Sequence, residues 1–469
     1  MGDFMKRLLC SLIVILLFSQ VHVAEAKTNN QDLRTYRIVI DRFLNGNEKN
    51  NKHIHNNKND QLPYGGDFQG IISKLDYIKE MGFNSINISP VFEKEQNDYL
   101  GYKIKNYEKI DSVYGGEENF NKMIKMAHQK GLKVIVDMPV TATDGFTATK
   151  DVKMNDIAKQ YYKDIDVIDF NQVANQQKYQ KMLANFVSKY KVDGISMYLY
   201  QDHMDFTDIL PKDMIKMAIL NEVSSVKGFD YVEKGQSTKD IAQSFKTTDQ
   251  KMPATFEADE MLAADNFFTP RFTKFAADEN MFPGTRIKLL MAYLYIQKHP
   301  VAMTYGTEIA MNGKDMPGIH QLLDFRTEKE VTDYLKTTSE VLHKYRALYT
   351  GEAKIIYNKE GNQVIRFDTN DVDYIFNINN TSKSTAVNLD KTYVEKGKML
   401  SGLLIGDRVY EKDGQYKLIT NREEAELYAV INERGLNYGY IIAAATIIIL
   451  FTIFIVLVAK KSKRKQQIS

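Results

Sequence analysis

Two hydrophobic patterns alternate along most of the chain. Short apolar runs predict buried strands, whereas longer stretches with an apolar residue every three or four positions predict amphipathic helices. Ile71, Leu75 and Ile78 repeat in this way up to Gly82, and a second helical stretch spans residues 120–130. Their alternation predicts an α/β fold, a (β/α)8 TIM barrel. The eight expected strands are residues 36–40, 84–88, 133–136, 194–198, 217–220, 229–232, 267–268 and 301–305.

The pattern changes to a period of two from about residue 353. Residues 354–357 and 374–378 are rich in isoleucine and aromatic residues, which favour half-buried strands of an antiparallel sheet. We therefore expect a barrel over residues 27–352 and a C-terminal antiparallel β domain over residues 353–432.

The N-terminal segment has the pattern of a secretory signal peptide over residues 1–26. Lys6 and Arg7 precede an apolar run, and residues 24–26 read Ala-Glu-Ala, a typical cleavage pattern. An uncleaved N-terminal anchor is the alternative. The single cysteine, Cys10, lies in this segment, so the mature protein is expected to contain no disulfide.

The C-terminal segment has the pattern of a membrane anchor. Residues 440–459 carry no charge and are mostly apolar, which predicts a transmembrane helix. The basic tail, residues 460–469, is expected in the cytoplasm by the positive-inside rule, which leaves the large domain extracellular. The predicted location is therefore the cell membrane, with a single span.

Composition and charge argue against one class of function, nucleic-acid binding. The chain has 469 residues, 43% of them hydrophobic and 26% charged, as expected for a protein with a large core. Its formal net charge of +2, with no strongly basic domain, argues against a nucleic-acid-binding protein.

A series of short motifs follows the predicted strands in a fixed order. They read Asp-Arg-Phe at residues 41–43, Tyr-Gly-Gly-Asp-Phe at 64–68, Asp-Tyr-Leu-Gly-Tyr at 98–102, Ile-Asp-Phe-Asn at 168–171 and Tyr-Gly-Thr-Glu-Ile at 305–309. In this order they resemble the α-amylase superfamily, glycoside hydrolase family 13, over nearly the whole external domain. The resemblance implies the same barrel and a carbohydrate-related function.

The resemblance also locates the positions at which this family carries out catalysis. Residues 192–198 are similar to the fourth-strand signature G-F-R-x-D, so Tyr198 takes the place of the nucleophilic aspartate and Ser196 that of the arginine. Phe268 takes the place of the aspartate that stabilises the transition state, and Glu222 that of the acid/base. Because retaining hydrolysis needs two carboxyl groups about 5–5.5 Å apart, these changes favour a pseudoenzyme.

Further family positions are changed, and other carboxylates lie nearby. The site histidines are replaced by Leu100, Ala142 and Phe267, and a usual calcium-binding asparagine by Thr141. A relocated nucleophile remains an alternative, because residues beyond the fourth strand could reach the site. These residues are Asp202, Asp205 and Asp208. The family's partner of the fourth-strand aspartate falls at Asp202, and His203, one position later, could take its place.

Sugar contacts are expected from Tyr99, Tyr102 and Arg271, which the resemblance places at the substrate site. Aromatic faces stack on sugar rings, and the chain has no tryptophan to do so. The alternative is that Tyr198, Phe267 and Phe268 collapse together and fill the mouth of the barrel.

A calcium site is expected in the loop after the first strand, which resembles that of cyclodextrin-glucanotransferase-like members. Calcium binds six to eight oxygens from carboxylates, amides and backbone carbonyls. The alternative is a polar loop without metal. The implied ligands are Asn45, Asn47, Asn50, Asn51, Gly65 and Asp67.

Together these patterns predict a membrane-anchored, extracellular α-amylase-like pseudoenzyme. Its partner would be an α-glucan, a cell-wall polysaccharide, or another protein of the membrane or cell envelope. The competing hypothesis is a divergent α-glycosidase or transglycosylase that uses Glu222 and a relocated nucleophile.

Overall fold

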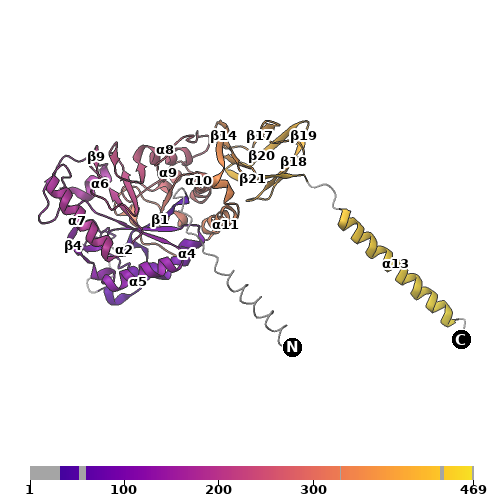
Figure 1. Cartoon of the computed structure of the whole chain (residues 1–469), viewed down its shortest axis with the longest axis horizontal. Helices are drawn as coiled ribbons and strands as arrows, with labels where there is room; N and C mark the ends of the chain where they lie inside the picture. The colour runs from indigo at the N-terminus through magenta and orange to yellow at the C-terminus, as the bar shows by residue number, and fades with distance from the viewer. Residues whose placement is uncertain (1–31, 52–59, 328, 434–437, 467–469) are drawn as a thin grey trace, which may run out of the picture.

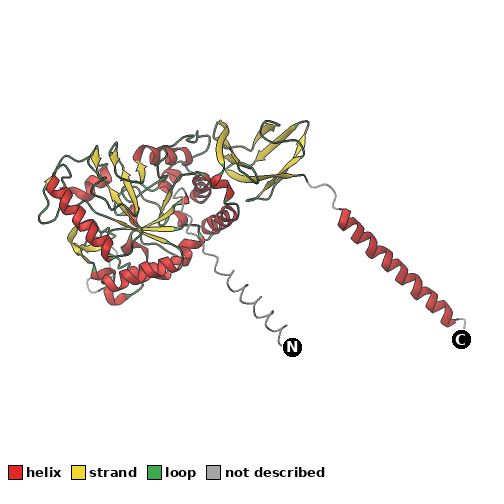
Figure 2. Cartoon of the chain, in the orientation of Figure 1, coloured by secondary structure: helices red, strands yellow, loops and turns green. Residues whose placement is uncertain are grey.

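The computed structural model describes residues 32–51, 60–327, 329–433 and 438–466, and within the last helix it describes side chains 442–458 (Figure 1). The predicted signal peptide, residues 1–26, lies outside the described residues. The described chain forms a barrel of strands surrounded by helices, a separate antiparallel sheet domain and a long C-terminal helix (Figure 2).

Seven parallel strands form the barrel sheet, in the spatial order β12-β10-β8-β5-β2-β1-β13. Residues 260–262 close it, because Glu260 bridges to Val232 of β12 and Leu262 bridges to Val301 of β13, both in parallel. The strands are β1 (Arg34–Ile38), β2 (Ser85–Ile88), β5 (Lys133–Asp137), β8 (Gly194–Tyr198), β10 (Ile215–Leu220), β12 (Tyr231–Lys234) and β13 (Val301–Thr304). Every residue of β2, β8 and β13 is buried, as expected for parallel strands covered by helices.

The seventh strand was predicted at the wrong place. Residues 260–262 complete the barrel, whereas Phe267 and Phe268 lie in a turn that follows. Both phenylalanines are fully buried, so their hydrophobicity resembles that of a buried strand although they pair with none. The first strand also ends earlier than predicted, since α2 (Ile40–Phe43) begins at Ile40.

Helices and short strands surround the barrel. The predicted helix around residues 71–81 is two helices, α3 and α4, separated at Lys74. The helices are α3 (Phe68–Ser73), α4 (Leu75–Glu80), α5 (Gly116–Gln129), α6 (Asp156–Tyr161), α7 (Val173–Lys189), α8 (Gly235–Phe245), α9 (Phe272–Asp278), α10 (Pro283–Ile296), α11 (Glu330–Lys344) and α12 (Ala347–Thr350). The short strands are β3 (Phe92–Lys94), β4 (Ile104–Ile110), β6 (Ala148–Thr149), β7 (Val167–Ile168), β9 (Met204–Asp205) and β11 (Val226–Lys227).

The C-terminal domain is one antiparallel sheet of eight strands, in the order β14-β15-β16-β21-β18-β19-β20-β17. It has its own apolar cluster, which includes Ile375, Leu400 and Leu418. Helix α10 of the barrel contacts β16 and β21 of this sheet. The strands are β14 (Glu352–Lys359), β15 (Asn362–Asp368), β16 (Tyr374–Asn379), β17 (Thr385–Asp390), β18 (Lys398–Gly402), β19 (Arg408–Lys412), β20 (Gln415–Thr420) and β21 (Glu424–Asn432).

The predicted membrane span over residues 440–459 falls on helix α13 (Tyr438–Gln466). Apolar side chains of this helix from Ile442 to Val458 are largely exposed. Among the described residues, however, no helix is long and apolar enough to cross a membrane. The transmembrane helix therefore stays a prediction.

Candidate functional site at the barrel mouth

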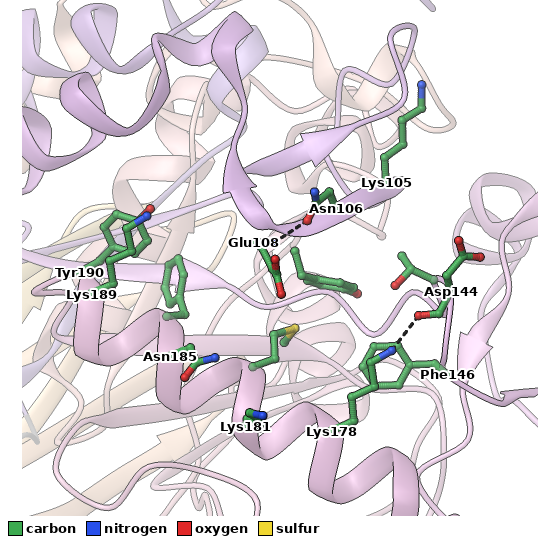
Figure 3. A pocket seen from close by; sticks show the side chains of 14 residues that line it. Lys105, Asn106, Glu108, Asp144, Phe146, Lys178, Lys181, Asn185, Lys189 and Tyr190 are labelled. Atoms are coloured by element: carbon green, nitrogen blue, oxygen red, sulfur yellow. Dashed lines mark hydrogen bonds between the residues drawn. The ribbon is translucent and has the colours of Figure 1, made fainter.

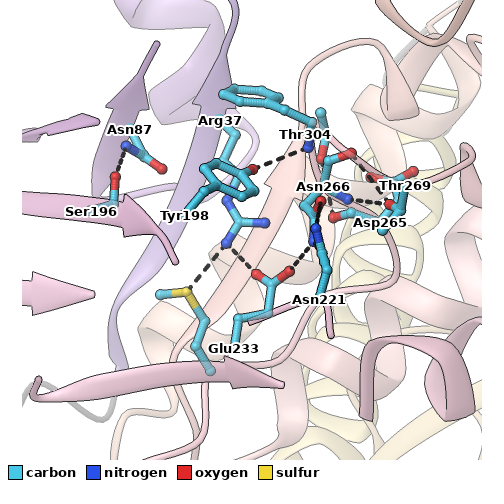
Figure 4. Close-up of polar contacts among 12 residues, drawn as sticks. Arg37, Asn87, Ser196, Tyr198, Asn221, Glu233, Asp265, Asn266, Thr269 and Thr304 are labelled. Atoms are coloured by element: carbon cyan, nitrogen blue, oxygen red, sulfur yellow. Dashed lines mark hydrogen bonds and ion pairs between the residues drawn. The ribbon is translucent and has the colours of Figure 1, made fainter. Parts of the chain in front are cut away.

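Tyr198 ends strand β8 and points into the mouth of the barrel (Figure 4). Its side chain is buried, and its hydroxyl oxygen accepts a hydrogen bond of 3.1 Å from the backbone N–H of Phe267. Burial, the largest effect, raises the pKa of the phenol well above its ordinary value. Tyr198 is therefore a neutral, hydrogen-bonded phenol at physiological pH, which is a poor nucleophile.

Aromatic rings pack around Tyr198 and form what we call the aromatic plug. The ring centroid of Phe268 lies 4.9 Å from that of Tyr198 and 5.4 Å from that of Tyr102, in edge-to-face contacts. Phe267 and Phe268 are 0% exposed and Tyr198 is 2% exposed, so these rings are packed against one another and shielded from solvent. The aromatic plug consists of Tyr102, Tyr161, Tyr162, Tyr198, Phe267 and Phe268.

Ser196 belongs to a buried polar network. Asn87 donates hydrogen bonds to the Ser196 Oγ (2.7 Å) and to the Asp137 Oδ1 (2.9 Å), and the Ser196 hydroxyl donates to the same carboxylate. The Tyr102 hydroxyl donates to the other oxygen of Asp137 at 2.5 Å. Burial raises the pKa of Asp137 to about 6, against the opposing effect of the hydrogen bonds from Tyr102 and Asn87.

A buried ion pair inside the barrel was not anticipated from the sequence. Arg37 of β1 and Glu233 of β12 are paired and almost completely buried. The Asn266 side chain donates to the Glu233 Oε1 and to the Asn221 Oδ1, each at 2.8 Å, which links the pair to the turn before Phe267 (Figure 4). The available signal was Arg37 within a strand expected to be buried, because a buried charge needs a partner; Glu233 lies one residue beyond the strand expected at 229–232 and was therefore not recognised as that partner.

Glu222 lies outside this network. Strand β10 ends at Leu220, and the Asn221 side chain turns inward to Asn266. The side chain of Glu222, the next residue, is exposed to solvent. The acid expected from the motif is thus present in the sequence but is not enclosed with the residues at the barrel mouth.

The other candidate carboxylates have different surroundings. Asp202 pairs with Lys153 and accepts a 2.6 Å hydrogen bond from the Ser224 N–H, and the Lys153 contact lowers the pKa of Asp202. Asp205 and Asp208 are exposed. The His203 Nδ1 contacts the Ser225 Oγ at 2.9 Å rather than the Asp202 carboxylate.

The three residues expected to contact sugar differ in accessibility. Tyr99 lines a cavity of about 300 Å³, together with Asp98, Lys103 and Tyr161. Tyr102 is 1% exposed and donates to Asp137. Arg271 is also 1% exposed and donates to the Tyr305 carbonyl oxygen at 2.7 Å and to the Thr307 Oγ1 at 3.0 Å. In this arrangement Tyr99 reaches the cavity, whereas Tyr102 and Arg271 support the barrel.

The expected calcium loop surrounds the carboxylate of Asp67. This carboxylate accepts hydrogen bonds from the Gly46 N–H (3.1 Å), the Asn50 side-chain amide (3.3 Å) and the Gly70 N–H (2.7 Å). The Asn47 Oδ1 accepts from Lys49, and Gly65 has a φ of +87°, with its N–H bound to Asp41.

Two buried oxygens of the same loop, the Asn45 Oδ1 and the Asn51 Oδ1, have no hydrogen-bond partner among the residues that the structure describes. Unpaired amide oxygens in the same loop as a carboxylate are of the donor type that calcium prefers. The described residues contain no cluster of three or more His, Cys, Asp or Glu that could hold a metal. A metal in this loop would therefore depend mainly on amide and backbone oxygens.

Comparison with known proteins agrees with this architecture. Residues 37–209 match the α-amylase catalytic domain family, and residues 351–428 match the α-amylase C-terminal domain family. An Anoxybacillus α-amylase structure is 30% identical, with a TM-score of 0.75, and the match covers 87% of this chain and 99% of that chain. The chain belongs to the α-amylase family.

Other relatives of this α-amylase-family protein share less of its sequence or length. The acarbose complex of the Geobacillus thermoleovorans α-amylase is 26% identical with a TM-score of 0.73, and the match covers 86% of this chain and 99% of that chain. The Paenibacillus polymyxa β/α-amylase is 36% identical over 148 residues, which are 30% of this chain and 12% of the relative. The chain thus spans far less than two thirds of the length of this curated relative.

Proposed function

We propose that this α-amylase-family protein is a catalytically silent member that binds α-glucan or a related wall polysaccharide. The observation that carries the proposal is the aromatic plug: Tyr198 and Phe268 stand at the two expected aspartate positions and are buried against each other. A substrate bond could not approach this position without displacing several packed rings.

The chemistry of the available groups supports the same proposal. Double displacement needs one ionised carboxylate as the nucleophile and one protonated carboxyl group as the acid. Tyr198 offers a neutral phenol whose oxygen accepts the Phe267 N–H. Glu222 is exposed to solvent and is not enclosed with the residues at the barrel mouth.

Glucan binding is assigned to the cavity beside Tyr99, at the edge of the aromatic plug. The cavity volume is about 300 Å³, which suits one or two sugar units, and its polar lining includes Glu95, Asn97 and Lys103. The aromatic residues of its lining are Tyr161, which is half-buried, and Tyr99, which is 6% exposed and has the Arg42 guanidinium over its ring. The Geobacillus relative was solved with acarbose, a sugar-like ligand, bound.

Display outside the cell and a calcium-stabilised loop complete the proposal. Helix α13, with its exposed apolar side chains, holds the protein at the membrane, and the domains lie on the extracellular side. The loop around Asp67 holds a structural calcium ion through Asp67, Asn45 and Asn51 and has no catalytic role.

The function is tested by measuring turnover and binding in the same sample. The purified full chain is incubated with maltoheptaose and calcium, reducing ends are counted, and binding is measured by titration calorimetry. We expect binding without new reducing ends, and we expect Tyr99→Ala to weaken binding by about tenfold, as for loss of a central aromatic contact.

Two other outcomes would contradict the proposal. Turnover that disappears in Glu222→Gln would establish the competing hypothesis, an active glycosidase or transglycosylase with a relocated nucleophile. Neither turnover nor binding of maltoheptaose or wall polysaccharide would instead point to a protein partner in the membrane or cell envelope.

A further inference from the structure

A larger hollow lies on the flank of the barrel, between strand β4 and helix α7 (Figure 3). We call it the flank groove. Its volume is about 570 Å³, and it shares no lining residue with the cavity beside Tyr99 or with the aromatic plug. It is therefore a separate place at which a ligand could bind.

Four lysines line the flank groove. Lys178, Lys181 and Lys189 are three and eight residues apart on α7, which places them on one face of the helix, and Lys105 comes from β4 on the other side (Figure 3). Lys105 and Lys181 are exposed and form no ion pair or hydrogen bond with any residue that the structure describes. Both are thus available to an anionic ligand.

The other two lysines are already held in place. The Lys178 ammonium donates to the Asp144 carbonyl oxygen at 2.7 Å and lies 4.3 Å from the ring centroid of Phe146. Lys189 pairs with Glu117 at 2.6 Å. The acidic lining residues are Glu108 and Asp144, so four lysines against two acids leave a formal excess of two positive charges.

The floor of the groove is aromatic. Phe146 is half-buried, and its ring centroid lies 6.4 Å from that of Tyr107, while Phe186 and Tyr190 lie farther along the same groove. The C–H groups of a sugar ring pack against such aromatic faces, whereas lysines bind phosphate or carboxylate groups as point charges. An aromatic floor between lysines suits a ligand that has both an apolar ring face and negative charges.

We propose that the flank groove binds an anionic glycan, that is, a saccharide chain that carries carboxylate or phosphate groups. The sugar ring packs on Phe146, and the negative groups contact Lys105 and Lys181 on the two sides. This site is independent of the neutral-glucan site proposed beside Tyr99, and a ligand can occupy both at once.

The test measures the binding of three heptasaccharides to the full chain: galacturonate heptamer, phosphorylated maltoheptaose and neutral maltoheptaose. We expect the anionic probes to bind and their affinity to fall as salt is added. The double variant Lys105→Gln/Lys181→Gln is expected to weaken binding by about tenfold, the sum of two exposed ion pairs. The more tightly bound anionic probe identifies carboxylate or phosphate as the preferred group.

Matched variants make the result decisive. Lys125→Gln/Lys239→Gln removes the same charge from two exposed lysines on α5 and α8 and should leave binding unchanged. Phe146→Ala should weaken both anionic probes without changing the salt dependence. The proposal is overturned if neither anionic probe binds, or if the groove variant and the matched control lose affinity equally. Because neutral maltoheptaose tests the cavity beside Tyr99, failure at one site is distinguishable from failure at the other.

Discussion

Tyr198 stands at the position where the family resemblance implies a nucleophilic aspartate, and its surroundings suit a neutral phenol. A charged nucleophile would need a polar, hydrated surrounding, but Tyr198 lies among buried rings and satisfies the backbone N–H of Phe267. The same hydrogen bond fixes the turn that brings Phe268 over the barrel. The residue at the end of β8 is therefore coupled to the shape of a turn far away in the sequence.

Removing this hydroxyl should destabilise the protein. In Tyr198→Phe the buried Phe267 N–H loses its acceptor, so we expect the free energy of unfolding to fall by about 1–3 kcal/mol. Urea unfolding monitored by circular dichroism measures the change. Tyr410→Phe, at a half-exposed position, is the control and should change stability by less than about 0.5 kcal/mol. Equal stability of Tyr198→Phe and the wild type would contradict the role of the hydroxyl.

Asp137 should make stability depend on pH between about 4 and 6. Burial raises its pKa from 3.8 to about 6, so the native state holds the proton more tightly than the unfolded state. The resulting stabilisation is complete below the unfolded value and is lost as the pH rises through about 6. The wild type should lose up to about 3 kcal/mol relative to Asp137→Asn from pH 4 to 7. Unfolding curves at several pH values test this, with the exposed Asp213→Asn as the control.

At the scale of elements, one loop and two helices differ in how their two sides are packed. The loop between β1 and α3 gathers an acidic residue and unpaired amide oxygens, and α10 is buried on nearly all sides because it lies between the barrel and the second domain. Helix α7 is different, since one face packs on the barrel while its lysines line the flank groove. The loop and α7 thus each present polar or charged groups beside a packed side, whereas α10 is packed on both sides.

Calcium should stabilise the loop around Asp67. At a hundredfold excess over its dissociation constant, a ligand specific to the native state adds about 2.7 kcal/mol to the free energy of unfolding. We expect calcium to raise the melting temperature and a chelator to reverse the change. Asp67→Asn retains an oxygen that can cap α3 but removes the charge, so it should abolish the calcium effect. A calcium response equal to that of the wild type in this variant would contradict the proposed site.

Helix α13 should determine where the protein is found. We expect the full chain in the membrane fraction after a salt wash, and a variant that ends at Asn432 in the soluble fraction, because exposed apolar side chains of α13 favour lipid. Fractionation followed by immunoblotting measures the distribution. Recovery of the full chain from the soluble fraction would contradict membrane anchoring.

At the scale of the whole molecule, Arg286 connects the barrel to the C-terminal sheet. It lies on α10, is 0% exposed, and donates to the Phe245 carbonyl oxygen at 2.7 Å. It also contacts Asn380 and pairs with Glu423 of the second domain at 3.1 Å. One buried guanidinium therefore satisfies groups from both domains, which favours their unfolding as one unit.

Loss of Arg286 should weaken this connection. Arg286→Met removes the guanidinium that contacts the Glu423 Oε1 and the Asn380 Oδ1, although Glu423 keeps its second partner, Arg422. We therefore expect a loss of about 3 kcal/mol, the lower end for a broken buried pair, and a split of the calorimetric transition into two. Arg326→Met is the matched control, because Arg326 is exposed and its pair with Asp324 should contribute at most about 1 kcal/mol. A single, unshifted transition in Arg286→Met would contradict the connection between the domains.

The hydrophobic periodicity was sufficient to predict the barrel and the antiparallel sheet that follows it, because this periodicity is a local property of each strand and helix. The order of the short motifs was sufficient to predict the family. These patterns could not place Phe267 and Phe268 in a turn, since two consecutive buried residues look like a strand until the pairing of residues 260–262 is known. Nor could they show that Glu222 faces solvent or that Arg37 pairs with Glu233, because both depend on how distant strands meet when the barrel closes. The substitutions at Tyr198 and Phe268 were visible in the sequence, but their packing into the aromatic plug was decided by tertiary contacts between β8 and that turn.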